Sequence, residues 1–306
     1  LPPMPFLTIF TAPKPFTDSH IDTIQRNALR NWQALGPGVE VFLVGEEAGM
    51  AQVAAEYGVR HLPNVTRNEF GTPLVSAIFR VAREASESPL LCYVNADMLF
   101  LPEFLDACRA VSAQTGDFLI IGQRWDLDLT TPFDFAAPDW AVKLKDRVRC
   151  ESGLHAPAGS DYFVFRRTQY AHIPDFAIGR PSWDNWMIYH ARKEGWPVID
   201  GTPTIEIIHQ NHDYSHLPGG KPPYGGVEGN RNIALARGDA NEYSAYLVLD
   251  TNKELRGENI TAPTLTLPRF LRRLEVALMP ADEKGPRFAL ARRVERWRKQ
   301  IVKARY

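Results

Sequence analysis

An asparagine and an aspartate two residues apart follow a very apolar segment of the chain. The segment 90–94 reads LLCYV, and Asn95 and Asp97 come directly after it. We expect 90–94 to form a buried strand, because short apolar runs are typical of strands covered on both faces. Two oxygen-bearing side chains beyond such a strand can point the same way and bind a hard cation that bridges two phosphates. The alternative is an Asx turn, which these residue types also form readily.

Strands and helices that alternate along the first half of the chain would position this pair. A possible cap at Asp18 or Ser19, followed by apolar residues at helical spacing, predicts a first helix that runs to Trp32. Further helices are expected at 48–57, 73–85 and 102–114, and strands at 6–11, 39–44, 59–62, 90–94 and 118–122. Apolar strands that alternate with helices predict an α/β fold with a mostly parallel central sheet flanked by helices.

The second half of the chain is less regular. After a polar and aromatic region at 124–150, we expect a strand at 163–165, a helix at 184–193 and a strand at 204–209. Residues 211–232 are rich in glycine, proline and histidine, which predicts a mobile loop. Because ligands of parallel α/β sheets bind beyond the carboxyl ends of the strands, we expect the functional site there.

The alternating strands and helices are followed by Asn95, Ala96 and Asp97. This arrangement resembles the family-2-like GT-A glycosyltransferases, in which an aspartate-containing motif ends a strand of the nucleotide-binding half. The resemblance covers residues 6–212. It implies a GT-A fold and transfer of a sugar from a nucleotide-diphosphate sugar to an acceptor. It also implies that Asp97 binds Mn²⁺ or Mg²⁺ and that Asn95 and Ala96 lie beside the donor. Asn95 departs from the acidic residue usual at its position.

Asp184 resembles a second signature of this family, an acidic residue at the start of a helix. In inverting members that residue deprotonates the acceptor hydroxyl, which implies that Asp184 is the catalytic base. A carboxylate within hydrogen-bond reach of a hydroxyl takes its proton as the new bond forms. Exposed aromatic rings such as Trp183 and Trp186 would stack on sugar faces. The alternative is that Asp184 only caps the helix.

Histidines follow the strand expected at 204–209. Metal-dependent GT-A enzymes often supply a late histidine to the cation, which implies His209 and His212 as candidate ligands beside Asp97. A neutral imidazole suits Mn²⁺ better than Mg²⁺, because Mg²⁺ prefers oxygen ligands and keeps its waters. These ligands therefore favour manganese.

The remaining binding residues are expected from the resemblance and from fold analogy. For the nucleotide they are Thr11, Ala12, Pro13, Glu46 and Asn68. For the diphosphate they are two cations of a glycine-hinged lid, Lys221 and Arg231. For the donor or acceptor sugar they are Arg124, Trp125, Gly159 and Asp161. An ordinary loop in place of the lid, a turn at Asp161 and simple packing of Trp125 stay open as alternatives.

Charge and cysteine content limit which partners and which compartment we expect for the protein. The 306 residues carry 35 basic and 36 acidic side chains, a balance that predicts no nucleic-acid partner. Three cysteines without metal-ligand spacing indicate free thiols, at least two of them buried, in a reducing compartment. We therefore expect a cytoplasmic protein.

The chain divides into three expected parts. These are a catalytic domain at 1–215, with a nucleotide-sugar-binding half at 1–122 and an acceptor half at 123–215, a mobile loop and connecting segment at 216–267, and a basic amphipathic helical tail at 268–306. In the tail, Leu290, Val294, Trp297 and Ile301 share a helical face among arginines and lysines. Such a helix could lie on an anionic membrane as a peripheral contact, or dock on the acidic body or a second copy.

Four functions share these features. An inverting, metal-dependent sugar transfer with Asp184 as base is the leading hypothesis, and a retaining transferase in which Asp184 orients the sugar is the runner-up. A nucleotidyltransferase is disfavoured, because residues 11–15 (TAPKP) contain no glycine-rich loop. A non-catalytic glycan-binding protein on the same scaffold stays an alternative, because Asn95 stands where an acidic residue is usual.

Overall fold

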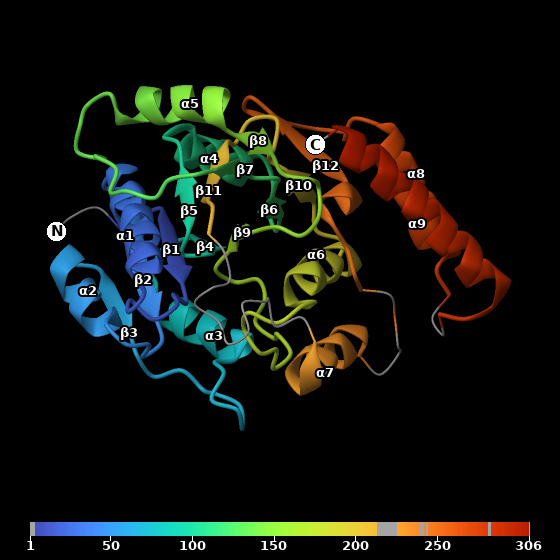
Figure 1. The fold of residues 1–306 in the computed structure, drawn as a ribbon, viewed down its shortest axis with the longest axis horizontal. Helices are drawn as coiled ribbons and strands as arrows, with labels where there is room; N and C mark the ends of the chain where they lie inside the picture. The colour runs from blue at the N-terminus through green and yellow to red at the C-terminus, as the bar shows by residue number, and fades with distance from the viewer. Residues whose placement is uncertain (1–3, 213–224, 239–241, 243, 281–282, 306) are drawn as a thin grey trace.

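The computed structural model describes residues 4–212, 225–238, 242, 244–280 and 283–305 (Figure 1). Its helices are α1 (Ser19–Ala34), α2 (Met50–Tyr57), α3 (Val75–Ala85), α4 (Glu103–Gln114), α5 (Trp140–Glu151), α6 (Trp183–Lys193), α7 (Gly226–Arg237), α8 (Leu267–Leu278) and α9 (Gly285–Arg305), with a 3₁₀ turn η1 (Val248–Asp250). Its strands are β1 (Leu7–Thr11), β2 (Val39–Val44), β3 (Arg60–Leu62), β4 (Leu90–Val94), β5 (Met98–Phe100), β6 (Leu119–Ile121), β7 (Trp125–Leu127), β8 (Gly153–Leu154), β9 (Tyr162–Arg166), β10 (Val198–Asp200), β11 (Ile207–Gln210), β12 (Lys253–Arg256) and β13 (Asn259–Thr261).

The main sheet runs through the centre of the molecule. Among the described residues its strand order is β13-β12-β10-β6-β9-β4-β1-β2-β3. β1, β2, β3 and β4 are mutually parallel, as are β6, β10 and β12. β9 lies between β4 and β6 and is antiparallel to both. The prediction of a mostly parallel α/β sheet is confirmed.

Each face of the main sheet is covered by helices. Side chains alternate between the two faces of a strand, so Ile9 packs in one apolar cluster with Trp32 of α1. Its neighbour Phe10 points to the other face, where it packs edge-to-face against Phe79 of α3. Burial on both faces explains why central strands such as β4 (LLCYV) are apolar at every position.

A second, four-stranded sheet has the order β5-β11-β7-β8. β5 is antiparallel to β11, β11 is parallel to β7, and β7 is antiparallel to β8. Figure 1 shows α5 alongside this small sheet, and it packs on β7. β7 and α5 lie in the region 124–150, for which we expected little regular structure, so the helix there was missed.

The elements predicted for residues 6–122 are present, with shifts of one or two residues at their ends. The prediction of a loop over 211–232 is wrong for residues 226–232, because α7 begins at Gly226. Tertiary contacts hold this glycine-containing helix: buried Asn232 donates to the Ala177 carbonyl and accepts from the Ala177 N–H. Lys221, the other lid residue, lies outside the described residues.

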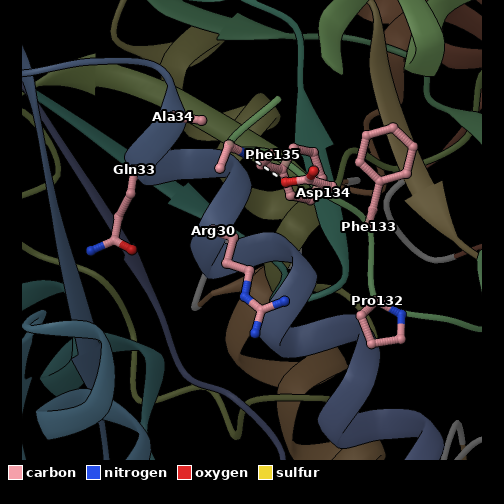
Figure 2. Close-up of a pocket in the computed structure, with 8 residues that line it drawn as sticks. Arg30, Gln33, Ala34, Pro132, Phe133, Asp134 and Phe135 are labelled. Atoms are coloured by element: carbon pink, nitrogen blue, oxygen red, sulfur yellow. Dashed lines mark hydrogen bonds between the residues drawn. The ribbon is translucent and has the colours of Figure 1, made fainter. Parts of the chain in front are cut away.

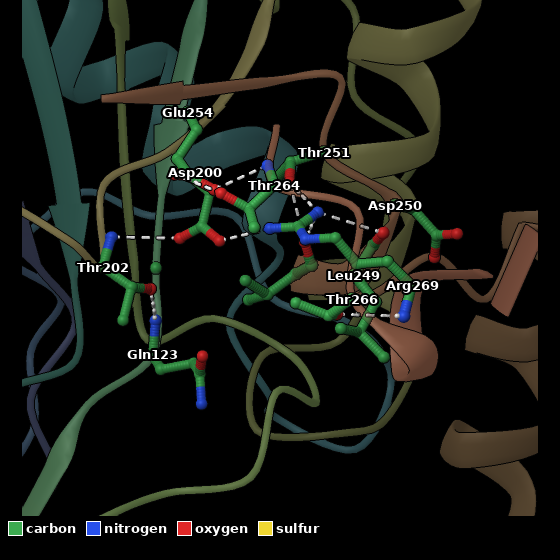
Figure 3. Close-up of polar contacts among 12 residues, drawn as sticks. Gln123, Asp200, Thr202, Leu249, Asp250, Thr251, Glu254, Thr264, Thr266 and Arg269 are labelled. Carbon is green, nitrogen blue, oxygen red and sulfur yellow. Dashed lines mark hydrogen bonds and ion pairs between the residues drawn. The ribbon is translucent and has the colours of Figure 1, made fainter. Parts of the chain in front are cut away.

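The expected connecting segment contributes strands to the main sheet. β12 pairs in parallel with β10, and β13 pairs antiparallel with β12. The tail then docks beside them, since Arg269 of α8 is buried and forms an ion pair with Asp200 at the end of β10 (Figure 3). Arg269 also donates to the Thr251 hydroxyl at 2.7 Å. These contacts hold α8 on the body of the protein.

α9 packs against α8 through a second buried ion-pair group. Arg272 contacts both Asp250 and Glu275, and Glu275 also binds Arg298 of α9.

None of the described helices is both long enough and apolar enough to span a membrane. All three cysteines are free thiols; Cys92 and Cys108 are buried.

Candidate functional site

The antiparallel strand β9 brings Asp161 to the carboxyl end of β4. Val94, the last residue of β4, pairs with Tyr162, the first residue of β9, so the residue after one strand meets the residue before the other. The Asn95 N–H donates to the Asp161 carbonyl at 3.0 Å, and the Asn95 side-chain amide donates to Asp161 Oδ1 at 2.9 Å. Asn95 therefore positions Asp161.

The small sheet places His209 beside Asp97 and Asp126 beside His209. β5 begins at Met98, immediately after Asp97, and Met98 pairs with His209 of β11. His209 in turn pairs with Asp126 of β7. This register explains how residues more than a hundred positions apart come to face one another.

Asp97, His209 and His212 form a cluster with the composition of a cation site. Asp97 Oδ2 lies 3.1 Å from His212 Nε2 and 3.8 Å from His209 Nε2, and one ligand atom from each residue lies within 4.8 Å of the others. Asp97 Oδ1 is buried and has no hydrogen-bond partner within the described chain. A buried carboxylate oxygen without a partner is costly, so these residues fit a divalent cation that would take it as ligand.

The charges around Asp97 keep it ionised. Burial opposes ionisation, but the hydrogen bond to His212 and the charges of His209 and Lys14 outweigh it and hold the pKa of Asp97 well below its usual range. Burial lowers the pKa of Lys14, against the pull of Asp97. A deprotonated carboxylate is the form that binds a metal.

Lys14 is a site residue that the sequence reasoning missed. Its Nζ lies 3.3 Å from His212 Nε2, and its backbone N–H and carbonyl are held by the Gln25 side chain. The signal was its position, three residues beyond the end of β1, at the edge where ligands bind parallel sheets. It adds an ammonium group beside the carboxylate of Asp97.

A chain of acids and bases extends from the cluster. His209 Nδ1 lies 3.3 Å from Asp126 Oδ1, and Asp126 Oδ2 lies 2.7 Å from His155 Nδ1. Burial opposes ionisation of Asp126, but its bonds to both histidines and the charge of Arg124 lower its pKa well below the usual range. Carboxylates that hold the far nitrogen of a ligand histidine fix its orientation, so Asp126 can orient His209. No sequence pattern marked His155.

Arg124 connects this chain to Asp161. Its Nε donates to Asp126 at 2.9 Å and its Nη1 donates to Asp161 Oδ2 at 2.8 Å. Trp125, the next residue, is half-buried and packs against the core. Arg124 thus neutralises two carboxylates, and its role in sugar binding stays a prediction.

Asp184 lies in the first turn of α6, directly against Gly159. A Cβ atom at position 159 would lie 2.2 Å from Asp184 Oδ2, so only glycine leaves room for the carboxylate there. Burial, with a smaller contribution from the charge of Asp161, raises the pKa of Asp184 to about 6. The N-cap of α6 is Ser182, so Asp184 does not occupy the capping position. A carboxyl group of this pKa can accept a proton near neutral pH.

The expectation that Trp183 and Trp186 are exposed is wrong. They are only 7% and 8% exposed, because α6 turns both residues toward the main sheet. Trp183 packs edge-to-face on Tyr93 of β4, and Trp186 stacks on His190 one turn further along α6. Their rings already have aromatic partners in the core, so neither offers an open face to a sugar.

The residues expected around the nucleotide have varied surroundings. Thr11 is buried, and its hydroxyl has no partner within the described chain. Ala12 and Ala96 are half-buried and Pro13 is buried. Glu46 is exposed, whereas the next residue, Glu47, has one buried oxygen without a described partner and one paired with Arg67 at 3.0 Å. Their roles in nucleotide binding stay predictions, and Glu47 joins them as a residue the sequence reasoning missed.

Two other predicted donor residues make contacts within the protein. The Asn68 side chain accepts two backbone N–H groups of the turn that follows it and donates to Glu228 of α7 at 2.7 Å. Arg231 of α7 forms an ion pair with Glu69 at 2.9 Å, and both side chains are at least half exposed. The structure thus places Arg231 on a helix, tied to the loop before α3.

An open pocket of about 640 Å³ lies away from these residues (Figure 2). It is bounded by α1, with Arg30 and Gln33, and by the loop 132–136. It includes none of the residues predicted to carry the chemistry. We therefore locate the candidate site by its converging polar side chains and not by this pocket.

No protein-family model and no curated protein matches the chain. Several solved structures are similar to part of the chain at low identity. A glucosyl-3-phosphoglycerate synthase from Mycobacterium tuberculosis, in complex with Mg²⁺ and UDP, is 13% identical with a TM-score of 0.45, over 76% of this chain and 78% of that one. A mannosyltransferase from Pyrobaculum calidifontis, in complex with GDP-Man and Mn²⁺, is 12% identical with a TM-score of 0.41, over 68% of this chain.

S. aureus TarS 1-349 is 13% identical with a TM-score of 0.40, over 68% of this chain. The chain spans 57% of the length of the mannosyltransferase and 58% of TarS. These likenesses are distant, so the function has to follow from the residues of this chain.

Proposed function

We propose that this chain is a metal-dependent glycosyltransferase, which moves a sugar from a nucleotide-diphosphate sugar to an acceptor hydroxyl. The observation that carries the proposal is the convergence of Asp97, His209 and His212 at the carboxyl end of β4, where Asp97 Oδ1 is buried and has no hydrogen-bond partner among the described residues. Asp161 links this cluster to Asp184, since Asn95 holds its carboxylate and Asp184 lies against Gly159, two residues before Asp161. A cation-binding group and a carboxylate with a raised pKa thus belong to one site.

Asp97, His209 and His212 would hold the cation, and the two imidazoles favour Mn²⁺ over Mg²⁺. When bound there, the cation would neutralise charge on the diphosphate leaving group. Lys14 brings a further positive charge to the same edge. Asp126 holds His209 in orientation from behind.

Asp184 acts as the general base in this proposal, and the reaction inverts the anomeric configuration. A pKa of about 6 leaves Asp184 mostly deprotonated at neutral pH, and basic enough to take a proton from an acceptor hydroxyl. Gly159 lets the carboxylate sit close to the backbone before β9. Asp161 and Arg124, held by Asn95 and Asp126, line the sugar side with fixed hydrogen-bonding groups.

The donor lies, in this proposal, across the ends of β1, β2 and β4. Thr11, Ala12 and Pro13 border the nucleotide. One oxygen each of Thr11 and Glu47 has no partner among the residues that the structure describes and is available to bind it. The acceptor is a carbohydrate or glycoside. Buried thiols at Cys92 and Cys108 support a reducing, cytoplasmic location.

A donor screen tests this function. Purified protein is incubated with UDP-, GDP- and other activated sugars in the presence of Mn²⁺, Mg²⁺ or EDTA, and release of nucleoside diphosphate is measured. We expect metal-dependent turnover of one donor class, including slow hydrolysis without acceptor, and its loss in Asp97→Ala. Glycan binding without turnover of any donor, and unchanged in Asp97→Ala, would support the non-catalytic alternative.

The stereochemistry is tested separately once the donor is known. Nuclear magnetic resonance of the first product formed distinguishes inversion from retention. Inversion is expected if Asp184 removes the acceptor proton. Retention would overturn the role of Asp184 as base and leave the transferase function standing.

A further inference from the structure

The hairpin of α8 and α9 carries apolar side chains on its outside. It lies at one end of the molecule, beyond β12 (Figure 1). The inner face of α8 buries Leu271, Arg272 and Glu275. Its outer face presents Leu267, Phe270 and Leu274, which are 56%, 53% and 39% exposed. The spacing of three and four residues places these three side chains on one face of the helix.

α9 continues this pattern. Ala291, Val294 and Val302 are buried on its inner face. Leu290 and Trp297 are 49% and 58% exposed and lie two helical turns apart, on the same side of α9. Each helix thus packs on the protein through its inner face and presents large apolar side chains to water on its outer side.

The solvent-facing charges of α8 and α9 are also positive. The acids within α8 and α9 are Glu275 and Glu295, and both are buried in ion pairs with arginines. The cationic side chains Arg273, Arg293, Arg296 and Lys303 are exposed. Within the described helices, the solvent-facing charges therefore have one sign, and they surround exposed leucine, phenylalanine and tryptophan.

We propose that the outer face of the α8–α9 hairpin binds an anionic membrane surface. Its exposed apolar side chains suit the boundary between headgroups and acyl chains, where tryptophan is favoured. Its cations suit anionic headgroups, and each cation near such a surface strengthens binding by about fivefold. A second copy docked through the same face would set cations against cations, which disfavours a dimer. The inference does not depend on the proposed reaction.

Vesicle sedimentation tests this surface. The full chain is mixed with vesicles of phosphatidylcholine alone or of phosphatidylcholine with phosphatidylglycerol, and the bound fraction is measured. We expect binding to the anionic vesicles, weak binding to the neutral ones, and weaker binding at high salt, because salt screens the cations. Equal binding to both vesicles, or none to either, would overturn the proposal.

Two variants separate the apolar and the charged contributions. Phe270→Glu/Leu274→Glu and Arg293→Glu/Arg296→Glu should each lower the vesicle partition coefficient at least about tenfold. The matched controls are Val142→Glu on α5, which is 62% exposed, and Arg80→Glu on α3, and both should bind as the wild type does. Circular dichroism confirms folding of each variant, since all the changed side chains are exposed.

Two results would reject the membrane assignment. One is a variant of the hairpin that binds anionic vesicles as the wild type does. The other is a dimer in sedimentation velocity that dissociates in Phe270→Glu/Leu274→Glu, which would assign the face to a second copy of the chain.

Discussion

Two regions of this molecule bury many charged groups, and the buried carboxylates of the two regions differ in how they are paired. Beside the end of β10, the carboxylates Asp200, Asp250 and Glu275 each pair with an arginine of α8. At the end of β4, Asp97 keeps one buried oxygen without a partner in the described chain. We call the first region the C-terminal ion-pair group and the second the candidate site.

The difference distinguishes buried charges that stabilise the fold from buried charges that serve a function. A buried charge that is paired and hydrogen-bonded holds elements together, and removing one partner is strongly destabilising. A buried charge with an unused atom lowers stability unless a ligand completes it, which is why perturbed groups gather at functional sites. Changes in the candidate site should therefore reduce activity and spare stability, and changes in the ion-pair group should do the reverse.

Asp184→Asn should give the largest change in rate. Loss of the general base should lower kcat by about a thousandfold. The free energy of unfolding at neutral pH should be unchanged or higher, because burial disfavours the ionised carboxylate. Steady-state kinetics and urea unfolding measure the two effects. The matched control is Asp139→Asn, because the Asp139 side chain is exposed. It should change neither kcat nor the free energy of unfolding.

Arg272→Met should give the opposite outcome. It leaves Asp250 and Glu275 without their shared partner, and we expect a loss of about 3–5 kcal/mol in the free energy of unfolding. The kinetic constants of the folded variant should stay as in the wild type. The exposed neighbour Arg273→Met should lie within about 0.5 kcal/mol of the wild type. Equal stability of the two variants would remove the contrast between the regions.

Asp126→Asn tests whether a residue behind the cluster positions a ligand. Without this carboxylate His209 Nδ1 keeps only its contact with Asn211 Oδ1 at 3.2 Å, and the affinity for Mn²⁺ should fall by about 10–100-fold. Added Mn²⁺ should restore most of kcat, which a general loss of structure would not allow. Asp134→Asn in the loop 132–136 provides the control and should keep wild-type affinity.

The pH dependence should be the smallest of these effects. Because Asp184 acts deprotonated, kcat/KM should rise about tenfold per pH unit up to its pKa of about 6 and then level off. The effect of pH on stability has the opposite sign. Because burial raises the pKa of Asp184 from 3.8 to about 6, this carboxyl group contributes stability at low pH, and the contribution is lost as the pH rises through about 6. A rate profile without an inflection near pH 6 would separate Asp184 from the chemistry.

The sequence predicted the local parts of this account well. Apolar runs mark β1, β2 and β4, and the position of Asn95 and Asp97 follows from the end of β4 alone. The aromatic residues of α6 were misjudged, although their spacing held the answer. Trp183, Trp186 and Met187 share one helical face with the other buried residues of α6, which is the pattern of a core-facing stripe.

The non-local parts could not be predicted in the same way. Lys14 meets His212 across 198 positions of sequence, and Asp126 meets His209 only through the register of β7 and β11. Arg269 of α8 pairs with Asp200, which comes from a distant strand. Strand register and helix docking decide these contacts, and neither leaves a periodic signal in the chain.

Mn²⁺ titration followed by electron paramagnetic resonance tests the candidate site most directly. The wild type, Asp97→Asn and the control Asp139→Asn are titrated with and without a nucleoside diphosphate. We predict that the wild type and the control bind one Mn²⁺ per chain, more tightly with the nucleotide, and that Asp97→Asn loses this binding while its thermal unfolding stays unchanged. Binding in Asp97→Asn as tight as in the wild type would contradict the assignment of Asp97, His209 and His212 as the cation site.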